Sequence, residues 1–163
     1  MIQRIQSLYL LMAMTALSVM FFFPLAVVNP LGDMPSYLNL TGVVYMEGHG
    51  VYTEARYWFI GFTALAVLLL AGMAFVLFSY RHRPRQIKLS RIVSLVLVLF
   101  AGFLLLGLDQ VAAGMFKGLE LETPLVQYRW PVYMPLVAMG FMWLAMRGIR
   151  KDEELVRSAD RLR

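Results

Sequence analysis

The chain has 163 residues, of which 60% are hydrophobic and only 15% are charged, and its mean hydropathy is +0.67. A soluble domain of this length has too little interior to bury so many apolar side chains, so the composition is typical of a membrane protein. The formal net charge of +5 does not indicate nucleic-acid binding, because the basic residues bracket apolar segments instead of forming one continuous face. The absence of cysteine excludes disulfides, thiolate metal sites and cysteine-based catalysis.

Four apolar stretches predict an all-α membrane protein, a four-helix bundle that forms a single integral domain over residues 1–163. The spans are expected at residues 5–28, 57–80, 92–115 and 131–146. The first is longer than the apolar core of a cleavable signal peptide, which has about 7–15 residues, so we expect it to remain as a span.

The segment between the first two spans, residues 29–56, is the longest stretch that does not cross the membrane. Residues 37–46 and 51–57 are β-prone runs separated by the turn-forming residues 47–50. They predict a short hairpin over the outer end of the helices. An isolated two-stranded hairpin is only marginally stable in water, so this one requires the bundle or a partner as a platform.

A basic inner loop at residues 81–91 fixes the predicted orientation. It carries five cations and no acid, and we interpret these as topology anchors: Arg81, Arg83, Arg85, Lys88 and Arg91. Twelve of the 15 Lys and Arg residues fall on the same side as this loop, and cytoplasmic loops carry the excess of such residues. Both termini are therefore predicted to be cytoplasmic.

Asp109 is the one clearly intramembrane acid in the predicted spans, which makes it a candidate functional residue. It lies about 26 Å along the helix from Ile92, close to the far headgroup layer. A buried ion pair with Arg56 or Arg129, both expected on that side, is the leading interpretation. The alternatives are a role in proton or ion coupling and an interfacial acid exposed to solvent.

The tail, residues 147–163, is predicted to continue the fourth span as a charged cytoplasmic helix. Its apolar residues recur at helical spacing and form a thin stripe: Ile149, Val156, Ala159 and Leu162. This stripe is a candidate docking surface for a cytoplasmic partner. A solvated extension with basic anchors at the lipid headgroups is the alternative.

The two ends of the chain carry a resemblance to a known family. The opening MIQRIQSLYLL, the sequence FFFPLA after the first apolar run, and the closing IRKDEELVRSADRLR resemble the uncharacterised four-span inner-membrane proteins of Bacteroidota in domain-of-unknown-function family 4293. The likeness covers the whole chain. It implies a bacterial inner (cytoplasmic) membrane location, and it supplies no activity and no catalytic residues.

These observations favour a non-enzymatic membrane protein without a cofactor, a subunit or scaffold of an envelope complex whose partners are the lipid bilayer and other envelope proteins. No Ser/His/Asp set, HExxH sequence or phosphate-binding glycine loop is present. The alternative is a small ion- or proton-coupled carrier that uses Asp109, although internal repeats and broken helices are not evident.

Overall fold

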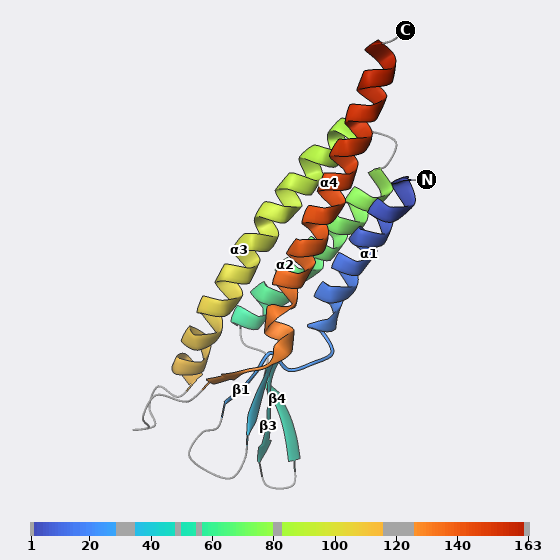
Figure 1. The fold of residues 1–163 in the computed structure, drawn as a ribbon. Helices are drawn as coiled ribbons and strands as arrows, with labels where there is room; N and C mark the ends of the chain where they lie inside the picture. The colour runs from blue at the N-terminus through green and yellow to red at the C-terminus, as the bar shows by residue number, and fades with distance from the viewer. Residues whose placement is uncertain are drawn as a thin grey trace.

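A computed structural model gives the architecture in Figure 1. It describes residues 2–28, 35–47, 50–54, 57–79, 83–115 and 126–161. Within these ranges only the backbone is described at residues 2–4, 45–47, 50–54, 58, 83, 111, 112, 114, 115 and 155–161.

In the described part of the chain, four helices run along one long axis, and a small sheet lies at one end of them (Figure 1). The helices are α1 (Ile2–Val19), α2 (Tyr57–Phe78), α3 (Arg83–Met115) and α4 (Met134–Arg161), the last preceded by the 3-10 turn η2 (Trp130–Tyr133). The amino- and carboxyl-terminal parts of the chain lie together at the end opposite the sheet. We call the two ends the sheet end and the termini end.

The first helix is shorter than the sequence predicted. α1 ends at Val19, and tighter backbone hydrogen bonds then close the turn, such as Phe22 N to the Val19 carbonyl oxygen at 3.1 Å. Pro24 has no N–H to donate and disfavours helical geometry at the preceding residue, so the apolar run cannot continue as helix. The prediction of one span over residues 5–28 was therefore wrong at its end, because Ala26–Val28 is strand β1.

Among the described residues, the sheet contains five antiparallel strands in the order β4-β3-β2-β1-β5. Their bounds are β1 Ala26–Val28, β2 Ser36–Asn39, β3 Gly42–Glu47, β4 Gly50–Glu54 and β5 Val126–Tyr128. β5 comes from the segment before α4 and pairs with β1, with Val27 opposite Gln127. The sheet thus joins the two segments of the chain that connect helices at this end.

The hairpin predicted around residues 47–50 is present as β3 and β4, with Glu47 paired to Gly50. The remainder of the prediction was too simple. The run at residues 37–46 turns at Leu40 and Thr41 and forms two strands, and two further strands complete the sheet. Three or more strands with an apolar face can be stable where an isolated hairpin is marginal.

The basic loop was also expected to be longer than it is. α3 already begins at Arg83, so most of residues 81–91 are helical and continuous with the third span. Two inward-facing polar residues, Gln86 and Ser90, are buried at spacing i, i+4, whereas Arg85, Lys88 and Arg91 are exposed. In a helix, the uncharged polar side chains face the bundle and the cations face outward, so helical geometry is favourable for this segment.

The interior between the two ends is apolar. Its buried side chains include Leu17 from α1, Phe62 from α2, Phe100 from α3 and Met142 from α4. Large apolar side chains are also exposed on the outside of the bundle, with Leu68 64% and Leu106 75% exposed. An exposed apolar surface around an apolar interior is the arrangement expected of helices in lipid.

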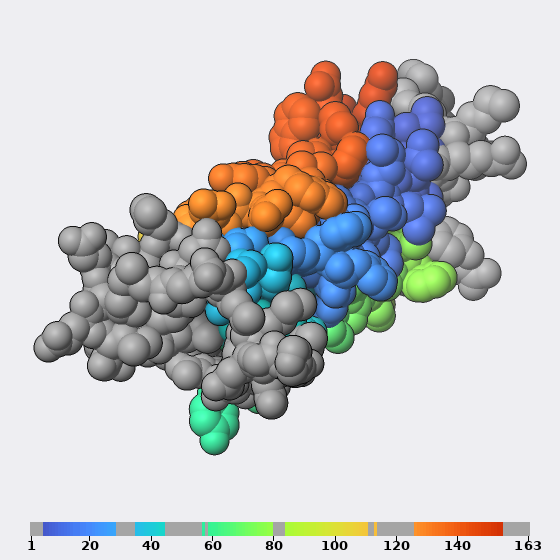
Figure 2. All heavy atoms as spheres, turned by 90° about the horizontal axis from the view of Figure 1, so that it is seen from below, coloured from blue at the N-terminus to red at the C-terminus, as the bar shows by residue number. Residues whose placement is uncertain are grey.

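Three helical segments among the described residues are long and apolar enough to cross a membrane: Phe59–Phe78, Pro84–Gln110 and Trp130–Glu154. The apolar part of α1, Ile5–Val19, is shorter, about 22 Å as a helix. α1 nevertheless packs against α4 along its length, and Figures 1 and 2 show the two side by side.

Candidate functional site

At the sheet end, one partly buried hydrogen bond fixes the sheet to α2. The Thr63 hydroxyl donates a 2.8 Å hydrogen bond to the carbonyl oxygen of Leu40, in the turn between β2 and β3. Leu38, Leu40 and Val43 are fully buried in the same core as the helices. The sheet is therefore an integrated part of the bundle and not an appended loop.

Asp109 lies at the same end and contacts β5. The Tyr128 hydroxyl donates a 2.5 Å hydrogen bond to Asp109 Oδ1, and the Leu105 carbonyl oxygen lies 3.4 Å from the same hydroxyl. Burial raises the pKa of Tyr128 above its ordinary value, and the hydrogen bond to Asp109 and the carboxylate charge raise it further. The phenol therefore stays neutral and serves as a hydrogen-bond donor between α3 and the sheet.

The predicted ion pair of Asp109 is replaced, in the part of the chain that the structure describes, by this contact with a tyrosine. Arg129 is exposed and makes no ion pair with Asp109 among the described residues. Arg56 lies outside the described residues, so the pairing with it stays a prediction. Asp109 itself is exposed, as in the third of the interpretations that the sequence allowed.

The termini end contains a buried polar contact between the two ends of the chain. Gln6 in α1 and Asp152 in α4 are 6% and 7% exposed, and Gln6 Nε2 donates a 2.6 Å hydrogen bond to Asp152 Oδ2. Gly148 makes room for the glutamine, because a Cβ at this position would lie 2.9 Å from Gln6 Cγ. A buried carboxylate requires such partners, so the contact fixes the position of α4 against α1.

A second polar contact at the termini end joins α2 to α3. Gln86 Nε2 donates a 3.2 Å hydrogen bond to the carbonyl oxygen of Val76, within the last turn of α2. The last four carbonyls of a helix have no partner within the helix, so Gln86 satisfies one of them. The Ser90 hydroxyl in turn donates to the Gln86 carbonyl oxygen at 2.8 Å.

The residues predicted as topology anchors lie at this same end. Arg85, Lys88 and Arg91 are exposed on α3. Arg83 is the first residue of α3, with its side chain outside the described part, and Arg81 lies outside the described residues.

One residue of the predicted docking stripe of the tail is buried, so it cannot contact a partner. Ile149 is 1% exposed and belongs to the bundle, so its assignment to a free surface was wrong. The helical spacing that placed it in the stripe is correct, but α1 and α4 pack together this far along the chain. The side chains of Val156 and Ala159, and Leu162 as a whole, lie outside the described residues.

Comparison with known proteins gives a family for this arrangement. Residues 2–162 match the family described as domain of unknown function DUF4293. The chain belongs to this family. No curated protein matches the sequence. The DUF4293 match covers all four helices and all five strands, so the sheet is part of the family domain rather than an addition to it.

The polar residues that organise the two ends were not singled out from the sequence. Gln6 and Asp152 are 146 positions apart, and nothing local relates them. Gln86 and Ser90 did carry a usable signal, because they are the uncharged polar residues at helical spacing within a basic segment. If Gln86 and Ser90 occupy the inner face of a helix, the basic residues between Arg85 and Arg91 fall on its outer face. The segment is therefore predicted to be helical.

Proposed function

We propose that this DUF4293 protein is a non-enzymatic integral protein of the bacterial inner membrane that serves as a subunit or scaffold of an envelope complex. In this proposal α1 is a fourth span, the termini end is cytoplasmic, and the sheet end faces outward. The excess of Lys and Arg at the termini end supports this orientation.

The observation that carries the proposal is the sheet. It is assembled from both connecting segments of one end, it shares its core with the helices, and β4 and β5 are its edge strands in the described part of the chain. An edge strand presents unpaired backbone groups, which are a ready template for a strand of another protein. A sheet that shares the core of the helices suits a docking role.

The interior argues against the alternative of a carrier that uses Asp109. Among the described residues, the buried polar or charged side chains are Gln6, Gln86, Ser90 and Asp152, and all four lie at the termini end. The buried side chains between the ends are apolar. Asp109 has an assigned contact with Tyr128 at the sheet end, and no polar path leads from it into the bundle within the described residues.

A shortened hairpin tests the docking role. Because Tyr45 and Tyr52 are paired, residues 46–51 can be replaced by Asn-Gly, which forms the two-residue turn that antiparallel strands favour. The matched control places Asn-Gly at residues 48 and 49, between the paired Glu47 and Gly50, so that both strands keep their length.

Both variants and the unmodified protein are expressed at native level, purified in mild detergent and analysed for co-purifying proteins by mass spectrometry. We expect the same envelope protein to accompany the unmodified chain and the control, and to be lost from the shortened variant while membrane insertion is unchanged. A chain that always purifies alone, or a partner retained equally by both variants, contradicts docking at the sheet.

A further inference from the structure

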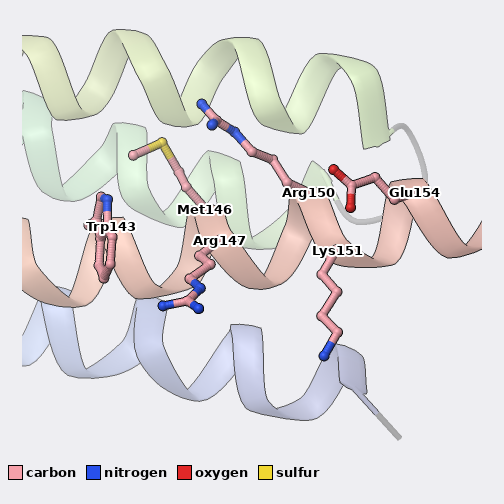
Figure 3. Close-up of a pocket in the computed structure, with 6 residues that line it drawn as sticks. All are labelled: Trp143, Met146, Arg147, Arg150, Lys151 and Glu154. Carbon is pink, nitrogen blue, oxygen red and sulfur yellow. The ribbon is translucent and has the colours of Figure 1, made fainter.

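A half-open groove of about 520 Å³ lies along one face of α4 at the termini end (Figure 3). Six residues line it, at the i, i+3 and i+4 spacings that bring side chains to one helix face: Trp143, Met146, Arg147, Arg150, Lys151 and Glu154. We call this surface the cationic groove. Its size is in the range of small-molecule sites, and its lining is charged at one end and apolar at the other.

Three cations and one carboxylate line this groove, with Arg150 and Glu154 on its α3 side and Arg147 and Lys151 on its α1 side (Figure 3). Arg147, Arg150 and Lys151 are exposed, and none of them forms an ion pair among the described residues. The Arg147 guanidinium lies over the Trp143 ring, 5.8 Å from its centroid, which holds the side chain against α4. A guanidinium fixed in this way presents its donors to an anion with little further loss of freedom.

The depth of the groove follows from its contact with α3. The Ser94 hydroxyl lies 3.9 Å from Met146 Sδ, so Met146 is level with Ser94. Ser94 is three residues after the last cation of the basic segment, Arg91, and marks the point where α3 becomes apolar. The groove therefore begins in the apolar layer, at Trp143 and Met146, and extends one to two turns into the polar layer.

This combination selects the class of ligand. A phosphate fits between Arg and Lys donors, which bind oxyanions through charge-assisted hydrogen bonds. The apolar residues at the other end, with Trp143 57% exposed, favour a ligand that also has an acyl chain. With Glu154 included, the groove has an excess of two positive charges. This excess matches a ligand with a single phosphodiester better than a peptide with several carboxylates.

We propose that the cationic groove binds the headgroup of an anionic phospholipid, with the phosphate between Arg147, Arg150 and Lys151 and an acyl chain against Trp143 and Met146. This site depends on membrane insertion and not on any protein partner. Failure of the docking test above would leave it unaffected.

Two variants with the same change in net charge test the site. The groove variant carries Arg147→Gln, Arg150→Gln and Lys151→Gln. The control carries Arg85→Gln, Lys88→Gln and Arg91→Gln, which removes three exposed cations from α3 at the same end. Full-length protein is purified in neutral detergent, titrated with phosphatidylglycerol, phosphatidylcholine or inorganic phosphate, and analysed by native mass spectrometry for bound lipid.

We expect one phosphatidylglycerol to remain bound to the unmodified protein and to the control, and phosphatidylcholine to bind at least tenfold more weakly. The single variant Arg150→Gln should weaken phosphatidylglycerol binding about fivefold, and the triple groove variant should abolish it. Arg147→Lys keeps the charge but loses the planar guanidinium over Trp143, so it should weaken binding less than Arg150→Gln.

Four results would overturn the proposal. Equal loss in the groove and control variants would show diffuse attraction of lipid to a basic surface. Equal binding of the two lipids would remove the role of charge. Displacement of phosphatidylglycerol by inorganic phosphate at millimolar concentration would indicate a site for the free anion. Stable binding of an acidic protein segment in place of lipid would assign the groove to a protein partner.

Discussion

The two ends of the bundle are held together by different kinds of interaction. At the sheet end, a backbone ladder joins the connecting segments, and apolar side chains such as Leu38 and Val43 attach it to the helices. At the termini end, the helices meet through buried polar side chains, with Gln6 on Asp152 and Gln86 on the end of α2. Backbone hydrogen bonds are available to nearly any residue, whereas a buried side-chain pair depends on two specific residues.

This difference suggests where each end tolerates change. The outer surface of the sheet can vary without loss of the ladder, which suits a surface that recognises partners. The termini end has less freedom, because removing one member of a buried polar pair takes a hydrogen bond away from the other.

The largest effect is expected at the termini end, from Gln6→Ala. The substitution removes the 2.6 Å hydrogen bond to the buried Asp152 carboxylate and leaves space beside Gly148. We expect the free energy of unfolding to fall by about 3 kcal/mol, since a bond to a buried charged group is lost. Equilibrium unfolding in detergent micelles measures the change.

Gln110→Ala is the matched control for this substitution, because Gln110 is an exposed glutamine on α3. Its effect should stay within about 0.5 kcal/mol. If the two variants unfold alike, the buried contact at the termini end contributes nothing measurable, and the contrast between the ends disappears.

A smaller effect is expected in α3 near the sheet end, from Gly107→Ala. A Cβ at residue 107 would lie 2.7 Å from Cζ of the buried Phe62, whereas nothing lies within 4 Å of a Cβ at Gly102 on the same helix. Overpacking of this kind costs about 1–3 kcal/mol, and the better helix propensity of alanine offsets at most about 1 kcal/mol of it.

Gly107→Ala should therefore be less stable than Gly102→Ala by about 2 kcal/mol, measured in the same unfolding assay. Equal stability of the two variants would mean that Phe62 moves away without cost. The helices near the sheet would then be packed loosely, contrary to a rigid platform.

Features set by neighbouring residues could be predicted from the sequence. The start of the second helix at Tyr57, the helical tail and the pairing of β3 with β4 follow from hydropathy and local turn chemistry. The early end of α1 was predictable in principle, because Pro24 interrupts the apolar run. Hydropathy alone predicts a longer helix, because the apolar run continues past Val19 to Val28.

Features set by distant residues could not be predicted in this way. β1 and β5 are about 100 positions apart, and their pairing depends on how the helices bring the two segments together. The same is true of Gln6 with Asp152, and of Tyr128 with Asp109. Asp109 was singled out from the sequence with an arginine as its leading partner, whereas its contact in the described part of the chain is with the Tyr128 hydroxyl.

The smallest effect is expected from Tyr128→Phe, and it depends on pH. Near neutral pH the lost hydrogen bond should reduce the free energy of unfolding by about 0.5–1 kcal/mol, because Asp109 is exposed and water can replace the phenol. The pKa of Tyr128 is raised in the folded protein above its ordinary value of 10.0. The neutral phenol therefore stabilises the fold fully below pH 10, and this contribution is lost as the pH rises above 10.

The unmodified protein should accordingly lose stability more steeply above pH 10 than Tyr128→Phe, so the difference between the two shrinks and can reverse sign. Tyr133→Phe, at an exposed tyrosine near the same end, is the control at neutral pH, where it should change the free energy of unfolding by less than about 0.5 kcal/mol. Unfolding in micelles between pH 7 and pH 11 compares the three proteins. Parallel curves for all of them would mean that Tyr128 ionises as it does in the unfolded chain, and that the contact between β5 and α3 does not hold the sheet to the bundle.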